Sequence, residues 1–101
     1  MNPPLPSRKG KTTRRKDIRG RPMVYTVADE DVFVAKGNPN KAFAIHKLQH
    51  KDGREEFRIG YYMIAVRPRA KGKWAWGQFA PMMTREEMAE IFGHLKAKGW
   101  I

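Results

Sequence analysis

The sequence predicts a single small α+β domain: an antiparallel sheet of four to five strands, covered on one face by a C-terminal helix and preceded by a disordered basic arm. Three patterns indicate this class. Residues 56–68 form an apolar run rich in β-branched and aromatic residues, residues 41–50 alternate apolar and polar, and helical apolar spacing follows residue 84. Because the chain has 101 residues, it is long enough for one core only.

The N-terminal segment, residues 1–22, is predicted to be a disordered basic arm, and the folded domain is predicted to cover residues 23–101. Besides proline, the arm has few apolar side chains, so it cannot bury enough surface to offset the entropy lost on ordering. It contains eight Lys or Arg and one Asp. We therefore expect a flexible, positively charged tail.

The folded domain is predicted to open with a short hairpin. Residues 23–27 and 32–36 are both rich in β-branched and aromatic residues, which favour strands. The acidic stretch between them, residues 28–31, is predicted to be a solvated turn. A cluster of Gly, Asn and Pro at residues 37–40 then interrupts regular structure.

Residues 41–50 and 54–67 are predicted to pair antiparallel, because Asp52-Gly53 between them suits a type I′ hairpin turn. The second of these strands is the expected centre of the sheet. Its side chains alternate between two faces. One face carries Phe57, Ile59, Tyr61 and Met63, and the other carries Arg58, Gly60 and Tyr62. We expect the helix to cover the apolar face and the second face to remain open.

A further strand is predicted over residues 74–79, followed by a helix that begins at Thr84. Thr84 and Glu87 have the spacing of a capping box, in which each side chain binds a backbone N–H group of the other residue. The helix has one apolar stripe, which consists of Met88, Ile91, Phe92 and Leu95. Gly99 is the expected end of the helix. Because this segment has no excess charge, we expect it to be scaffold.

The charge of the chain indicates a polyanionic partner. It has 21 Lys or Arg against 10 Asp or Glu, a net charge of +11, concentrated in residues 1–22 and 36–73. No apolar run is long enough to span a bilayer, and none follows the basic N-terminus as a signal peptide would require. The absence of cysteine excludes disulfides, a thiol nucleophile and Cys-containing zinc sites. We expect a cytoplasmic protein with no membrane partner, associated with the nucleoid if the source is bacterial.

Residues 19–22 have the sequence Arg-Gly-Arg-Pro, which resembles the core of the AT-hook, a short DNA-binding motif. The resemblance covers these four positions only. It implies that Arg19 and Arg21 enter a narrow AT-rich minor groove, with Gly20 letting the backbone lie close to its floor. Arg15 and Lys16 supply the basic flank. The alternative is a solvated linker in a tail rich in Arg and Gly.

The sheet region combines cations with aromatic rings, a pairing typical of surfaces that hold nucleic acid through phosphates and stacked bases. The order of elements also resembles that of positive-cofactor-type coactivators that bind single-stranded DNA, although no motif matches residue by residue. The candidate nucleic-acid-binding residues are Arg14, Arg15, Lys16, Arg19, Gly20, Arg21, Lys47, Arg58, Tyr62, Arg67, Arg69, Lys71, Lys73, Trp74 and Trp76.

Catalysis is not expected. His46 and His50 are four residues apart on a predicted strand, more than about 12 Å by the strand rise, which is too far for ligands of one metal. We therefore predict no enzymatic activity, no cofactor and no metal. The favoured function is nucleic-acid binding, with DNA, single- or double-stranded, preferred over RNA. The alternatives are an RNA- or ribosome-associated structural protein and a protein-interaction module that regulates a nucleic-acid enzyme. So many aromatics in a small domain also favour a homodimer.

Overall fold

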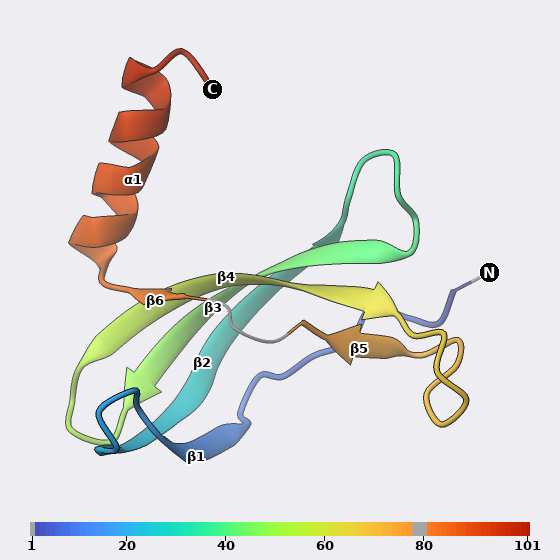
Figure 1. Cartoon of the computed structure of the whole chain (residues 1–101), viewed down its shortest axis with the longest axis horizontal. Coiled ribbons are helices and arrows are strands. Elements are labelled where there is room, and N and C mark those ends of the chain that lie inside the picture. The colour runs from blue at the N-terminus through green and yellow to red at the C-terminus, as the bar shows by residue number, and fades with distance from the viewer. Residues whose placement is uncertain (1, 78–80) are drawn as a thin grey trace.

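The predicted α+β class and antiparallel sheet are confirmed. The computed structural model describes residues 2–77 and 81–101, so the end of the strand predicted over residues 74–79 lies outside the described residues. The elements are β1 (Thr12–Lys16), β2 (Pro22–Val34), β3 (Lys41–His50), β4 (Glu55–Ile64), β5 (Trp74–Trp76), β6 (Met82–Met83) and the helix α1 (Arg85–Ala97). Strands β1 to β5 are neighbours in chain order, and β6 pairs with β4 (Figure 1).

The hairpin of β3 and β4 is confirmed as the centre of the sheet. The strands pair antiparallel from Lys41 opposite Met63 to Gln49 opposite Glu55. In the turn between them, Gly53 has a φ of +93°, a backbone conformation that residues with a Cβ atom rarely adopt. The Asp52 carboxylate accepts a hydrogen bond from the backbone N–H of Arg54. The predicted two-residue type I′ turn is wrong: the His50 N–H donates to the Arg54 carbonyl at 2.9 Å, so three residues, 51–53, connect the strands. The register is therefore one residue away from the one that a type I′ turn would give.

The hairpin predicted over residues 23–36 is wrong, because this stretch is one continuous strand, β2. It pairs with β3 along most of its length, with a register shift between Val27 and Asp29. Before this bulge, the inward side chains are at odd positions, such as Tyr25 and Val27; after it they are at even positions, beginning with Glu30. The acidic stretch is thus a point where the strand changes face, not a turn.

The disordered arm is not confirmed. Strand β1 pairs antiparallel with β2, from Thr12 opposite Thr26 to Lys16 opposite Pro22. The segment before β1 also contacts the opposite edge of the sheet, where the Trp74 indole N–H donates to the Pro3 carbonyl at 3.1 Å. Backbone groups of an edge strand provide this pairing, so it does not require the apolar side chains that the segment lacks.

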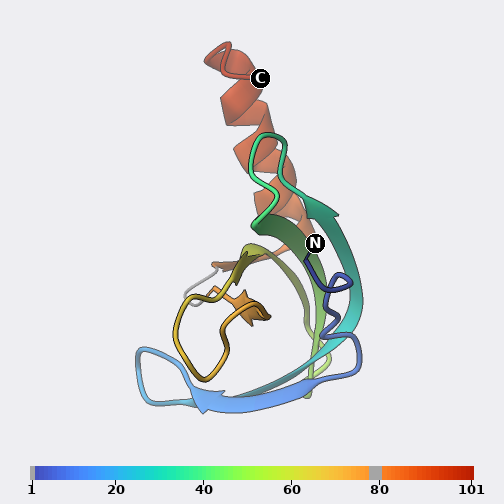
Figure 2. The same ribbon diagram turned by 90° about the vertical axis from the view of Figure 1, so that its right-hand side faces the viewer.

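The sheet curls strongly about its strands (Figure 2). Its inner face contains the buried apolar core, formed by Tyr25, Val27 and Leu48 with Met23 and Met82 packed against them. The expectation that α1 covers the sheet is not confirmed. Helix α1 follows β6, projects away from the sheet (Figure 1), and has no buried residue. Because the curl lets the sheet enclose its own core, the inner face is sealed without the helix.

Helix α1 has the predicted caps. The Thr84 hydroxyl accepts from the Glu87 backbone N–H at 3.1 Å, and the Glu87 carboxylate accepts from the Thr84 N–H at 2.7 Å. At the other end, Gly99 has a φ of +72° and the Trp100 N–H donates to the Leu95 carbonyl at 3.0 Å. These local contacts define the helix independently of tertiary packing.

Candidate nucleic-acid interface

Most of the candidate cations lie on the two outer edges of the curled sheet. One edge is β1 with the turn that follows it, and the other is the loop between β4 and β5. Both lie on the side of the sheet opposite to α1 in the two views (Figures 1 and 2). The exposed candidates on these edges are Arg14, Arg15, Lys16, Arg19, Gly20, Arg21, Arg67, Arg69, Lys71 and Lys73. We call these two segments the basic edges.

The first basic edge ends in a tight turn organised by Asp17. Its carboxylate accepts from the backbone N–H groups of Arg19 at 2.8 Å and Arg21 at 2.9 Å. It also pairs with the Arg21 guanidinium at 3.1 Å. Hydrogen bonds from the backbone N–H groups of Arg21 and Arg19 hold the pKa of Asp17 below its ordinary value. With Gly20 at a φ of +78°, residues 19–21 form a closed turn in this structure, not an extended segment.

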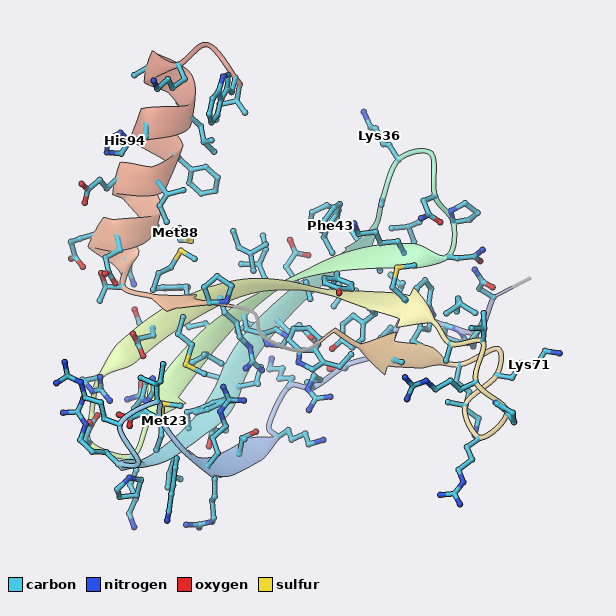
Figure 3. The ribbon with its side chains drawn as sticks, in the orientation of Figure 1. Met23, Lys36, Phe43, Lys71, Met88 and His94 are labelled. Atoms are coloured by element: carbon cyan, nitrogen blue, oxygen red, sulfur yellow. The ribbon has the colours of Figure 1, made fainter. Side chains whose placement is uncertain are left out.

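The second basic edge is a compact loop with its own backbone hydrogen bonds. The Ala65 N–H donates to the Lys73 carbonyl at 2.8 Å, and the Gly72 N–H donates to the Ala65 carbonyl at 3.0 Å. A turn inside the loop joins Ala70 to Arg67 at 3.1 Å. Figure 3 shows Lys71 extending into solvent from this loop. These hydrogen bonds give the loop one backbone conformation, from which its Lys and Arg side chains extend.

Two candidates, Arg58 and Tyr62, require correction. Both are buried, with exposed fractions of 5% and 2%. The Arg58 guanidinium donates from Nε to His46 Nδ1 at 2.9 Å, and from Nη1 to the Tyr25 hydroxyl at 3.1 Å. The Tyr62 hydroxyl donates to Glu30 at 2.6 Å. The sequence correctly placed the two residues on one face, but this face is the closed interior, so neither can contact a nucleic acid in this conformation.

The remaining candidates, Lys47, Trp74 and Trp76, are strand residues outside the two basic edges. Trp74 and Trp76 are partly buried. The Trp76 ring stacks on His46 at a centroid distance of 4.8 Å with an interplanar angle of 12°. Lys47 is exposed on the outer face and pairs with Glu55 at 3.4 Å. Trp74 directly follows Lys73 of the second basic edge, whereas Trp76 lies against the buried residues His46 and Arg58.

The interior contains a polar cluster that the sequence did not predict as a unit. Glu30 lies at its centre and accepts hydrogen bonds from the Tyr62 hydroxyl, the His46 ring and the backbone N–H of Arg8. The guanidinium groups of Arg8 and Arg58 lie 5.4 and 5.0 Å from the centroid of the Trp76 ring. We call the following residues the inner cluster: Arg8, Tyr25, Glu30, His46, Arg58, Tyr62 and Trp76.

The electrostatics of the inner cluster follow from these contacts. Burial alone would raise the pKa of the Glu30 carboxyl, but hydrogen bonds from Tyr62, Arg8 and His46 outweigh it and lower the pKa. Burial lowers the pKa of His46, and the positive charge of Arg58 acts in the same direction against the opposing effect of Glu30. A neutral His46 with the proton on Nε2 satisfies both contacts, because Nε2 donates to Glu30 and Nδ1 accepts from Arg58.

Acidification is expected to destabilise the protein from about pH 6.5 downward. An unfolded His46 takes up a proton near its ordinary pKa of 6.5, whereas the folded group has a lower pKa, so the unfolded state binds more protons and the free energy of unfolding falls. Glu30 adds to this loss below its ordinary pKa of 4.5, as pH falls through its lowered folded pKa. The His46 contribution to the slope is at most about 1.4 kcal/mol per pH unit.

Urea unfolding between pH 8 and pH 5 measures this slope. The His46→Gln variant, which cannot titrate at this position, is expected to lose less stability over the same range than the native chain. An equal loss in both proteins would assign the pH dependence to other groups.

The sequence did not give the His46–Arg58 pair, because the predicted two-residue turn would place His46 opposite Ile59, whereas the observed three-residue turn places it opposite Arg58. No feature of the sequence predicted that the Glu30 side chain is buried, since its inward orientation depends on the bulge in β2. No feature of the sequence predicted the contacts of Arg8 with this cluster either.

Among the described residues, no helix is long and apolar enough to cross a membrane. No family model matches the chain, and no curated protein or solved structure is significantly similar to it.

Proposed function

We propose that this protein is a non-enzymatic nucleic-acid-binding protein, with DNA favoured, and that it binds through the basic edges. One observation supports this most strongly. Eight exposed cations on these edges form no ion pair within the described part of the chain: Arg14, Arg15, Lys16, Arg19, Arg67, Arg69, Lys71 and Lys73. Elsewhere, most of the acidic groups are paired with a cation or a histidine.

The proposed mode of binding is contact with phosphates. Lys and Arg that neutralise phosphates release condensed counterions, which gives affinity with little sequence preference. Base stacking contributes less than the sequence suggested, because Tyr62 is buried and Trp76 is stacked on His46. On strand β1, Arg14 and Lys16 point to one face of the sheet and Arg15 points to the other. This edge therefore presents cations on both faces of the sheet.

Removing cations from the second basic edge is expected to weaken binding and its dependence on salt. In the variant Arg67→Gln, Arg69→Gln and Lys71→Gln, affinity for a DNA duplex should fall roughly tenfold or more at low salt. The slope of log K against log salt should become shallower by up to about 3, since each phosphate contact contributes about 0.9. Fluorescence titrations at two or more salt concentrations measure both quantities.

The matched control removes the same charge elsewhere, through Lys36→Gln, Lys96→Gln and Lys98→Gln, which are exposed positions off the basic edges. If the control loses as much affinity as the first variant, binding depends on net charge and not on these edges. An affinity of the native chain that hardly changes between low and physiological salt would refute the proposal. Titrations with single-stranded DNA and with RNA decide which nucleic acid is preferred, including the RNA-associated alternative.

The same titrations test the AT-hook resemblance. The double variant Arg19→Ala and Arg21→Ala is compared on AT-rich and GC-rich duplexes. A hook would lose affinity selectively on AT-rich DNA. The turn closed by Asp17 must open before Arg19 and Arg21 could enter a groove, so equal loss on both duplexes is the expected result.

A further inference from the structure

A large apolar surface is left uncovered on the outer face of the sheet. The outer face is formed by side chains of β2, β3 and β4 that point away from the inner cluster. Their exposed fractions are 47% for Phe33, 36% for Ile59, 41% for Tyr61 and 37% for Met63. Phe43, between Phe33 and Tyr61 in the register, completes this surface. This is the face that the sequence assigned to helix α1.

Helix α1 has an equally uncovered apolar surface. Ile91 and Phe92 are 46% and 41% exposed, and Trp100 and Ile101 beyond the helix are 72% and 66% exposed. Figure 3 shows Met88 on the side of the helix toward the sheet and His94 on the opposite side. Each chain therefore has an exposed apolar helix stripe and an exposed apolar sheet face. A helix and a sheet commonly bury such surfaces by packing against each other.

The first turn of the helix contacts β4 at the surface of the sheet. The Arg85 guanidinium donates to Glu55 at 2.8 Å and lies 5.5 Å from the centroid of the Phe57 ring. The capping box at Thr84 fixes the direction in which α1 leaves β6. Figure 1 shows α1 rising from the end of β6 without lying along β2 or β3.

We propose that a second copy of the chain covers these two exposed surfaces, with α1 of each copy lying on the outer face of the other. Such a contact obeys two-fold symmetry, because the same two surfaces meet twice. The 13-residue helix is about 20 Å long, which fits along the 10-residue strand β4, about 33 Å in length.

The exposed area agrees with what a stable dimer needs. Large apolar side chains can bury roughly 150–250 Å² each, so the partly exposed side chains of the two surfaces offer on the order of 800 Å² per copy. This sum over the two surfaces is about the area that each partner buries in a typical stable complex.

Charge favours the same arrangement. Residues 81–101 contain three Lys or Arg and three Glu, so this C-terminal segment is neutral although the whole chain has a net charge of +11. The Lys41 ammonium group lies over the Phe43 and Tyr61 rings of the outer face, so this surface already contains a cation, and a neutral helical segment adds no further positive charge to it. Because the basic edges lie on the opposite side of the sheet, the dimer leaves them free.

The experiment measures mass as a function of concentration by sedimentation and light scattering. The native chain is expected to show twice its monomer mass of 11.7 kDa at micromolar concentrations. Phe92→Glu in the helix and Ile59→Lys in the sheet should each raise the dissociation constant at least tenfold. The control His94→Glu adds a charge on the opposite side of the same helix and should leave it unchanged. A native chain that stays monomeric, or a dimer that neither variant weakens, overturns the proposal.

Mixing the two weakened variants tests which surfaces meet. In a mixed dimer, the native helix of one copy meets the native sheet of the other. Across the second contact, the carboxylate introduced at position 92 would face the ammonium group introduced at position 59, so the mixture should dimerise more tightly than either variant alone. Failure of the mixture to dimerise would show that helix and sheet do not meet and would overturn the arrangement.

Because the chain has no cysteine, crosslinking gives an independent result even where a charged variant is unstable. An oxidised mixture of Ile59→Cys and Phe92→Cys chains is expected to form disulfide-linked heterodimers. A monomeric intrachain disulfide in the double variant, without crosslinked dimers in the mixture, would instead place the helix on its own sheet and refute the proposal.

Discussion

Glu30→Ala is expected to destabilise the protein by about 3–5 kcal/mol, because it removes one partner from a buried charged network. The Glu30 side chain is 2% exposed and accepts from three donors: the Tyr62 hydroxyl, the His46 ring and the Arg8 backbone N–H. Alanine would leave all three unsatisfied. It would also remove the only carboxylate of the inner cluster, which contains the buried guanidinium of Arg58.

The matched control is Glu55→Ala. Glu55 also contacts two cations, Lys47 at 3.4 Å and Arg85 at 2.8 Å, but both pairs lie at the surface. Exposed pairs contribute little, so the control should lose less than about 1 kcal/mol. Urea unfolding at pH 7 compares the two variants. Similar losses for Glu30→Ala and Glu55→Ala would mean that the inner cluster is solvated and does not hold the sheet closed.

The parts of the fold that short-range sequence signals define were predictable. Asp52-Gly53 indicated the position of the central hairpin, although not its register, and Thr84 with Glu87 indicated the start of α1. In both cases the residues that make the structure lie within a few positions of each other. The exposure of the cations in the loop between β4 and β5 was predictable for the same reason, since glycine and charged residues exclude it from any core.

The burial of each sheet face could not be predicted from β4 alone. Its alternation correctly separated Arg58, Gly60 and Tyr62 from Ile59 and Tyr61, but composition favoured burial of the more apolar set. The structure buries the polar set instead, because Arg58 and Tyr62 find partners in His46 and Glu30 on neighbouring strands. A buried polar group is acceptable when it is hydrogen-bonded, and such partners are visible only after folding.

The N-terminal segment was mispredicted for a related reason. Low apolar content indicates that a segment cannot form its own core, but residues 2–16 use the core of the sheet. The Arg8 N–H donates to Glu30, and the Gly10 N–H donates to the Val27 carbonyl at 2.8 Å. Backbone donors make these contacts, so side-chain composition contains no signal for them.

Gly60→Ala is expected to destabilise the protein by about 3 kcal/mol through overpacking of the inner face. A Cβ atom at this position would lie 2.3 Å from Cη2 and 2.9 Å from Cζ2 of Trp76. The indole cannot easily move aside, because it stacks on His46 and meets the Tyr62 ring edge-on at a centroid distance of 5.0 Å. The added methyl group must therefore displace the ring from the inner cluster.

Gly77→Ala is the matched control, since a Cβ atom there would lie 2.5 Å from Cζ of Tyr61. Tyr61 is 41% exposed on the outer face, so its ring can rotate into solvent, and the loss of stability should stay below about 1 kcal/mol. Chemical unfolding measures both losses, and near-UV circular dichroism reports the displacement of Trp76 in Gly60→Ala. Equal stability of the two variants, with an unchanged Trp signal, would show that Trp76 does not pack against Gly60. The closed interior, and with it the reason for excluding Arg58 and Tyr62 from the nucleic-acid interface, would then have to be abandoned.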